Sequence, residues 1–445
     1  MEEKGILDLI EVALAKGAEA AEIYRIEQKF HLVDIREEKL DTLSQGRQEG
    51  IGLRVLERER IGFAFSSDLR EEGFHSLLDR ALIAARQSHP DPFLHIPPPP
   101  SSSYPKVEGY DPSLKEMSLA DRVDFARRME RAAKEFDSRI SKVRHCLYQD
   151  SDYSVLILNS RGLRAWAGGT YCSSSIHTVA EEKGSSETGW DMQSSSFFSD
   201  LQGEEVGRRA AKQAVLMLGA RALSTRRVDA ILSPPVAAEF LEMISAALMA
   251  DAVQKGKSLF ANRLGTQVAS GCLSLVDDGL LAHGSHSFPF DDEGTPSQRS
   301  PLIEDGILKG FLYDCYSAAK EGRSSTGNAC RPSFQSPPQI MATNLYAIPG
   351  ERPLQAMLQD MESGAWILSL MGMHTANSIS GDFSVGVEGL WIEKGKVQHS
   401  FRGVLIAGNM REWLHLLQEV GSDLRFFGSY GSASLCAKGI QLAGL

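Results

Sequence analysis

The sequence has few cysteines, and none of them forms a CxxC pair. A metal site built from cysteine needs several thiolates at close, regular spacing. The six cysteines of the 445-residue chain are instead far apart, at Cys146, Cys172, Cys272, Cys315, Cys330 and Cys436. We therefore expect free thiols in a reducing cytoplasm and no zinc centre made from cysteine.

A long uninterrupted apolar run is also missing. Crossing a membrane as a helix takes about 20 consecutive apolar residues. The most apolar long window, residues 236–253, is interrupted by Glu239, Glu242 and Asp251. The first four residues, Met1 to Lys4, lack the basic-then-apolar order of a signal peptide. These absences predict a cytoplasmic protein without membrane contact.

The sequence also lacks an excess of positive charge. Lysine and arginine number 47 against 58 acidic residues, which gives a net charge of −11. Because a protein that binds nucleic acid neutralises phosphates with a basic face, direct nucleic-acid binding is not expected.

The length of the chain suggests two or three domains. Changes in pattern divide it into an amino-terminal α+β domain at 1–88, a Pro/Ser-rich linker at 89–117, a helix plus antiparallel meander at 118–227, and a carboxyl-terminal domain at 228–445. The linker is assigned from Pro97 to Pro100 and the three serines that follow.

Periodicity predicts the secondary structure of the first half. Residues 5–15, 71–87 and 202–220 have helical spacing, while Ile51, Leu53 and Val55 alternate as in a strand. Ser118 and Asp121 form a capping-box pattern at the start of another helix. Residues 138–200 are predicted to form the antiparallel meander.

The second half predicts a mixture of strands and helices. Helices are expected at 235–253 and 410–419, and strands near 273–276, 307–313, 340–346, 367–370, 383–392 and 404–407. Because strands and helices do not alternate regularly, we predict an α+β fold with an amino-terminal α/β region and a carboxyl-terminal strand-rich mixed domain.

The segment from Phe290 to Pro332 combines a tight acid cluster, several glycines and neutral hydrogen-bonding residues. Asp291, Asp292 and Glu293 open it, and a second polar loop ends at Asn328. Two such loops, held by the strand between them, can line a cleft. Two solvated hairpin turns explain the same composition equally well.

Four segments in matching order resemble the TldD/PmbA family, also called modulators of DNA gyrase or TldD/TldE peptidases. They are FDDEGTPSQRSPLIEDGILKGFLYD at 290–314, STGN at 325–328, SGDFSVGVEGLWIEKGK at 380–396 and FRGVLIAGN at 401–409. Residues 50–69 resemble the first domain of that family, so the likeness extends over nearly the whole chain.

The resemblance implies a zinc peptidase whose metal-binding residues are altered in this chain. Catalytic members of the family carry His-Glu-x-x-x-His on a helix and a cysteine near the carboxyl terminus, a set that holds zinc and activates water. Matching those motifs places Leu241 and Ala246 at the histidine positions and Tyr430 at the cysteine position. Glu242 alone matches, as a remnant candidate only. The resemblance therefore implies the PmbA/TldE-like branch.

Two nearby histidines are candidate metal ligands. His283 and His286 are three residues apart and close in sequence to Asp277 and Asp278. The glycine and serine between the histidines favour a solvent-facing loop, so a ligand role is the weaker interpretation.

The leading hypothesis is a non-catalytic subunit of a cytoplasmic zinc metallopeptidase that acts on peptides or unfolded segments. The resemblance implies no cofactor in this chain, zinc in a TldD-like partner, and assembly with that partner or with itself. Candidate substrate-facing residues are Asp291, Asp292, Glu293, Arg299, Asn328 and Asp382. For each of them taken singly, a structural role in turns and caps is the slightly favoured alternative. Two alternatives stay open, namely a self-sufficient metallopeptidase with an unrecognised site and a protein-binding regulator of DNA gyrase.

Overall fold

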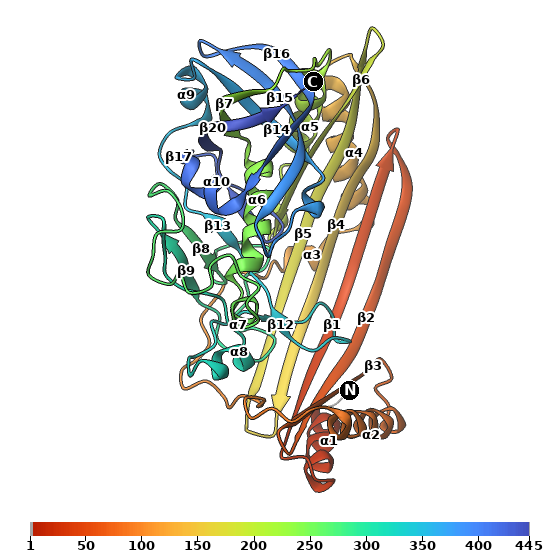
Figure 1. Ribbon diagram of the computed structural model, residues 1–445. Helices are drawn as coiled ribbons and strands as arrows, with labels where there is room; N and C mark the ends of the chain where they lie inside the picture. The colour runs from red at the N-terminus through yellow and green to blue at the C-terminus, as the bar shows by residue number, and fades with distance from the viewer. Residues whose placement is uncertain (1–2, 445) are drawn as a thin grey trace.

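A long antiparallel sheet forms one side of the molecule in the computed structural model, which describes residues 3–444 (Figure 1). Its six strands run in the order β3-β2-β1-β4-β5-β6. Their bounds are β1 Ala20–Arg36, β2 Lys39–Glu57, β3 Arg60–Ser66, β4 Ile140–Asn159, β5 Arg164–Glu182 and β6 Ser185–Ser195. We call this the N-terminal sheet.

The two halves of the N-terminal sheet come from either side of the proline-rich segment. Strand β1 pairs with β4 from Glu22↔Asn159 to Asp34↔Leu147. Residues 1–88 and 118–227 therefore contribute to one continuous sheet.

Four long helices cover the ends of this sheet. Their bounds are α1 Glu3–Ala15, α2 Glu71–Gln87, α4 Leu119–Phe136 and α5 Gly203–Met217. Helices α1 and α2 pack on β1 to β3 at one end, and α4 and α5 pack on β4 to β6 at the other (Figure 1). The strand predicted at Ile51, Leu53 and Val55 is confirmed as part of β2, and all three side chains are fully buried, while the intervening Gly52 and Arg54 are buried as well. The capping box of Ser118 and Asp121 is also present.

The proline-rich segment runs along the sheet in an extended conformation. Ile96 is buried against Ala20 and Leu56, and the Asn159 side chain donates a hydrogen bond to the carbonyl of Pro97. A short helix, α3 at Ser113–Glu116, follows before α4.

The carboxyl-terminal half covers the other side of the long sheet (Figure 1). Its largest sheet runs in the order β16-β15-β14-β7-β20-β17, and a further β16–β20 pairing closes it into a barrel. The strands are β7 Arg226–Leu232, β14 Ser363–Met371, β15 Asp382–Glu393, β16 Lys396–Asn409, β17 Leu417–Val420 and β20 Leu435–Ala443.

A second six-stranded sheet, made of shorter strands, lies beside the barrel, and its edge strand β18 contacts β6 of the N-terminal sheet. We call it the small sheet. Its order is β10-β9-β8-β13-β19-β18. The strands are β8 Leu275–Asp278, β9 Arg299–Glu304, β10 Ile307–Leu308, β13 Leu345–Ala347, β18 Arg425–Phe427 and β19 Tyr430–Ser432, and a two-stranded pair is formed by β11 Ala329–Cys330 and β12 Gln339–Ile340.

Five helices and three 3-10 turns complete the described chain. The helices are α6 Pro234–Ser245, α7 Ala250–Gln254, α8 Cys315–Lys320, α9 Leu354–Gln359 and α10 Met410–Leu416, and the turns are η1 Phe198–Asp200, η2 Ala246–Leu248 and η3 Met373–Thr375. The α+β prediction is confirmed.

Several predicted elements are shorter than expected. The helix predicted at 235–253 is interrupted, because Met249 is extended and the flanking backbone pairs with Leu312. The strand predicted at 307–313 ends at Leu308, and the one predicted at 340–346 is split between β12 and β13.

The helix predicted at 410–419 also ends early. It stops at Leu416, because the residues that follow pair with β20 as β17. None of the helices within residues 3–444 is long and apolar enough to span a bilayer.

Candidate functional site

The acid cluster at 291–293 faces inward. The Glu293 carboxylate lies 2.7 Å from the Arg54 guanidinium and accepts a hydrogen bond from the Cys315 backbone N–H. Arg54 also makes two hydrogen bonds to Glu22, at 2.9 and 3.0 Å. All three charged side chains are almost completely buried. Burial alone would lower the pKa of Arg54, but Glu22 and Glu293 raise it, so the guanidinium stays charged.

A second arginine extends this network. Arg331 lies 2.8 Å from Glu22, and both side chains are fully buried. Its backbone N–H donates to the Asp292 carboxylate, and its guanidinium lies over the Tyr24 ring at 4.8 Å. Burial raises the pKa of Asp292 to about 6. The acid cluster therefore ties the second half of the chain to β1 and β2.

Asp291 and Asn328 support the fold of the two loops. Asp291 accepts backbone hydrogen bonds from Glu293, Thr295 and Ala329. The Asn328 amide donates to Asp277 at 2.7 Å. These contacts explain why the loops stay together.

The predicted cleft is present, and three of the six candidate residues line it. Asp291, Asp292 and Asn328 lie on a cavity of about 240 Å³ between β1, β4 and the two loops. Its apolar wall includes Tyr153 and Phe288, which stack at 5.8 Å. The alternative of two solvated hairpin turns is wrong for these residues, because Asp291 and Asn328 are buried.

The other three candidates lie elsewhere. Glu293 is enclosed in the ionic network. Arg299 is exposed on β9, 3.6 Å from Asp278, and faces a different cavity. Asp382 is exposed at the start of β15 and accepts hydrogen bonds from Ser380 and Asn409.

A further cavity of about 550 Å³ lies beside helix α6 and turn η3. Glu239, Glu242, Met243 and Ala246 line it, at the i, i+3, i+4, i+7 spacing of one helical face. Burial, reinforced by Glu242, raises the pKa of Glu239 to about 7. This face holds two carboxylates that repel each other.

The three positions matched to zinc ligands lie on or beside helix α6 but do not face one common point. Leu241 is packed in the core with 1% exposure, whereas Ala246 faces the cavity. The Tyr430 hydroxyl is 3.1 Å from the hydroxyl of Ser245. Burial raises the pKa of Tyr430, so the phenol keeps its proton.

These side chains do not fit a zinc ion. Zinc takes thiolate, imidazole or carboxylate ligands, and Leu241 and Ala246 offer none of these groups. Across residues 3–444, no group of three or more His, Cys, Asp or Glu side chains is placed to hold a metal.

His283 has a partner that the sequence did not suggest. Its Nδ1 lies 2.9 Å from the Asp200 carboxylate, and its ring stacks on Phe197 with centroids 4.1 Å apart. Asp277 instead bonds Asn328 and Thr343. His283 and Asp277 therefore bind different neighbours.

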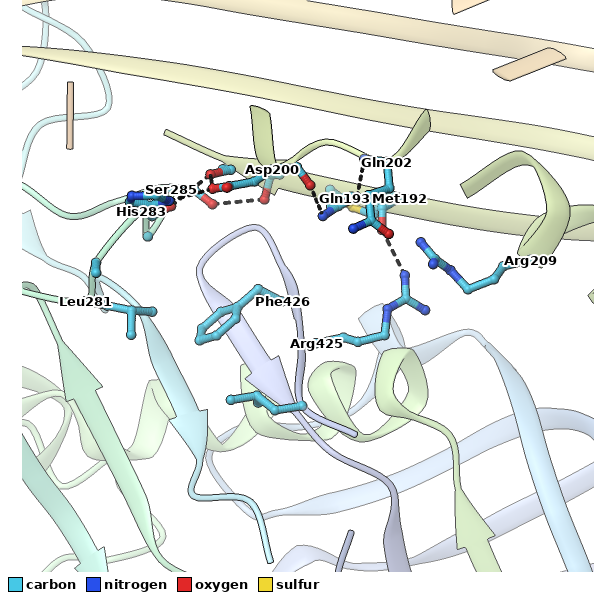
Figure 2. Close-up of a pocket in the computed structure, with 15 residues that line it drawn as sticks. Met192, Gln193, Asp200, Gln202, Arg209, Leu281, His283, Ser285, Arg425 and Phe426 are labelled. Carbon is cyan, nitrogen blue, oxygen red and sulfur yellow. Dashed lines mark hydrogen bonds and ion pairs between the residues drawn. The ribbon is translucent and has the colours of Figure 1, made fainter. Parts of the chain in front are cut away.

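Sequence reasoning also missed a cavity of about 440 Å³ at the junction of the N-terminal sheet and the small sheet (Figure 2). Arg209 of α5 and Arg425 of β18 approach one carboxylate there, Asp191 of β6. They are more than 200 positions apart, and no local pattern joins them.

Family models match most of the chain. The PmbA/TldA metallopeptidase domain 1 matches residues 21–85, the central domain 112–218 and the C-terminal domain 225–444. The chain belongs to the PmbA/TldD metallopeptidase family.

Relatives on both branches of the PmbA/TldD family are similar to this chain. Metalloprotease PmbA of Escherichia coli O157:H7 is 28% identical over 99% of this chain and 96% of that protein. A metalloprotease TldD homolog of Buchnera aphidicola subsp. Schizaphis graminum is 26% identical over 88% of this chain and 82% of that protein.

Solved structures share the fold over the full length. A Thermotoga maritima protein named as a modulator of a DNA gyrase has a TM-score of 0.91, 25% identity and coverage of 99% and 100% of the two chains. TldE from Thermococcus kodakarensis has a TM-score of 0.91 at 23% identity, with coverage of 99% and 100%.

Proposed function

We propose that this chain is a non-catalytic, TldE-like subunit of a zinc metallopeptidase. In this proposal a TldD-like partner supplies the zinc, the substrates are peptides or unfolded segments, and the complex works in the cytoplasm. The proposal rests on the identity of three side chains. Leu241, Ala246 and Tyr430 stand where zinc ligands are expected in a catalytic member of the family.

The surroundings of these positions support a structural role. Leu241 adds to the apolar core, and Tyr430 uses its hydroxyl to hold Ser245 of the same helix. Without a metal to lower the pKa of a bound water, Glu242 has no activated nucleophile to assist. Its neighbour Glu239 is half-buried and protonates near neutral pH, which suits a site without a cation.

The proposed contribution of the chain is to form walls around the substrate. The cleft lined by Asp291, Asp292 and Asn328 lies beside the rings of Tyr153 and Phe288. Strand β2 leaves residues 39–48 exposed beyond the end of its pairing with β3. An extended peptide can pair with such an edge through backbone hydrogen bonds.

Zinc analysis and a cleavage assay test this proposal. The purified chain is measured for bound zinc and assayed on unfolded casein and short peptides, alone and with a TldD-like subunit from the same organism. We expect no stoichiometric zinc, no cleavage by the chain alone, and chelator-sensitive cleavage by the mixture. Stoichiometric zinc, or chelator-sensitive cleavage by the chain alone, would establish the self-sufficient alternative.

Glu242→Gln provides the sharper version of this test. If Glu242 is a remnant, the complex containing the variant keeps the cleavage rate of the wild-type complex within about twofold. A loss of 100-fold or more, the range of general acid–base catalysis, contradicts the proposal. Glu412→Gln, exposed on α10, is the matched control.

Pull-down experiments address the partner. Retention of a TldD-like subunit supports the proposal, whereas retention of gyrase alone favours the regulator alternative. A partner-free homodimer that cleaves peptides would also overturn it.

A further inference from the structure

The cavity at the junction of the N-terminal sheet and the small sheet is lined by charged side chains that are far apart in the sequence. Residues of β6 and the loop after it form one wall, the loop at 281–285 a second, and residues 424–426 a third. Figure 2 shows Arg209 and Arg425 on one side, His283 and Ser285 on the other, and Phe426 between them.

One side of this cavity is cationic. The Arg209 and Arg425 side chains both bind Asp191, at 2.6 and 2.7 Å, and are about 30% exposed. Asp191 itself is buried. A guanidinium has five N–H donors, so two of them around a single carboxylate keep donors for another anion. Planar donors of this kind suit a carboxylate.

The opposite side offers hydrogen-bond acceptors. The Asp200 Oδ2 atom accepts a hydrogen bond from the Ser195 hydroxyl at 2.6 Å and lies 2.9 Å from Nδ1 of His283. Both contacts use the same oxygen, and the Asp200 side chain is 34% exposed where it lines the cavity. Ser285 pairs with Ser194 beside it, at 2.9 Å.

The balance of charges selects the kind of ligand. Arg209 and Arg425 are offset by Asp191 and Asp200, and Glu205 lies 3.9 Å from Arg209. A multiply charged anion such as a nucleotide would meet three carboxylates. A molecule with one carboxylate and one ammonium group adds no net charge to the cavity and finds partners of both signs there.

We propose that this cavity binds a dipeptide-sized zwitterion, with its carboxylate at Arg209 and Arg425 and its ammonium group at Asp200. Phe426 supplies an apolar surface for a side chain. The size agrees, because 440 Å³ equals a cube with an edge of about 8 Å and an extended dipeptide spans about 7 Å. The inference does not depend on the proposed subunit role.

The alternative is a purely structural role, in which the two arginines only join the N-terminal sheet to β18 through Asp191. A structural bridge would have no preference among small molecules. Binding selectivity therefore separates the two roles.

Isothermal titration calorimetry with glycyl-leucine on the full chain tests the proposal. We expect saturable one-to-one binding, at least tenfold weaker for glycyl-leucinamide, which lacks the carboxylate, and for N-acetylglycyl-leucine, which lacks the ammonium group. No binding at millimolar glycyl-leucine, or equal binding of all three molecules, overturns the proposal.

Three variants place the ligand in the cavity. Arg425→Gln and Asp200→Asn are expected to weaken glycyl-leucine binding at least tenfold, whereas Arg425→Lys retains part of it. Arg208→Gln is the matched control, because Arg208 is exposed beside Arg209 and its ion pair is with Glu205. Thermal unfolding shows whether each variant is folded.

If folded Arg425→Gln binds as tightly as wild type, the arginines only bridge the sheets and the proposal is wrong. Equal weakening in Arg208→Gln has the same consequence. Zinc content and partner binding are separate measurements, so failure here leaves the proposed subunit role untouched.

Discussion

At the scale of single residues, the acid cluster shows how burial changes the meaning of a charged motif. Asp291 and Glu293 look solvent-facing in sequence, yet their partners are backbone N–H groups and Arg54. A buried carboxylate persists only where such partners compensate for lost hydration. The acidic residues are visible in the sequence, but their pairing with Arg54 is not, because Arg54 lies 239 positions from Glu293.

Arg54→Met is expected to destabilise the protein strongly. It leaves the buried Glu293 carboxylate without its cation, while Glu22 keeps only Arg331. The loss should be roughly 3–5 kcal/mol, measured by urea unfolding at pH 7. The control Arg70→Met removes an exposed pair with Asp68 and should change the midpoint little. A small effect of Arg54→Met would show that the network contributes little to stability.

Glu239→Gln should stabilise the protein at alkaline pH. The pKa of Glu239 is raised from 4.5 to about 7, so folding favours its protonated form. Its contribution is full below pH 4.5 and is lost as pH rises through 7. With solvent screening taken into account, the variant should gain on the order of 1–2 kcal/mol at pH 8 and nothing at pH 4.

Thermal unfolding of Glu239→Gln and wild type across pH 4 to 9 measures this difference. Glu412→Gln should follow the wild-type curve. A gain that is the same at every pH would show that titration of Glu239 is not its cause.

At the scale of elements, close packing decides which helices and strands persist. The interrupted helix after Ser245 has good helical periodicity, but the backbone around Met249 pairs with Leu312 instead. Pairing that satisfies buried backbone groups overrides a local preference. Helix α5 packs so closely on β6 that only glycine fits at Gly189.

Gly189→Ala should therefore weaken the packing of α5 on the N-terminal sheet. An added Cβ would lie 2.0 Å from the Ala210 carbonyl oxygen and 2.6 Å from the Ala214 nitrogen, so the helix backbone must move. We expect a loss of roughly 1–3 kcal/mol in urea unfolding. Gly168→Ala, whose nearest neighbour is 3.5 Å away, is the control. Equal effects would contradict the close-approach argument.

At the scale of the whole molecule, the first 88 residues are integral to the rest. Strand β1 supplies the partner of β4, and Glu22 and Arg54 neutralise Arg331 and Glu293 in the second half. Separation of this region exposes a long strand edge and leaves buried charges without partners.

Removal of residues 1–88 is thus expected to prevent folding of the remainder. Circular dichroism should show loss of the cooperative thermal transition, and size-exclusion chromatography should show aggregation through the free β4 edge. Supplying residues 1–88 as a separate chain should restore part of the transition. A monomeric remainder with a sharp transition would show that the halves fold independently.

The sequence by itself determined the class of the fold, most of the element periodicity and the family. The spacing of the apolar residues Ile51, Leu53 and Val55 and the capping box at Ser118 are local patterns, which a single sequence is enough to reveal. The proposal for Leu241, Ala246 and Tyr430 is equally local, since it depends only on which side chains stand at positions matched to zinc ligands.

Only the tertiary structure decided which polar residues meet. It turned Glu293 toward Arg54, left Arg299 and Asp382 outside the cleft, and brought Arg209 and Arg425 to one carboxylate. Such contacts join residues hundreds of positions apart, and their strength depends on burial that no local pattern specifies. The physical reason is that the interaction energy and the pKa of a charged group depend on the dielectric and the partners around it. Only the folded chain determines both.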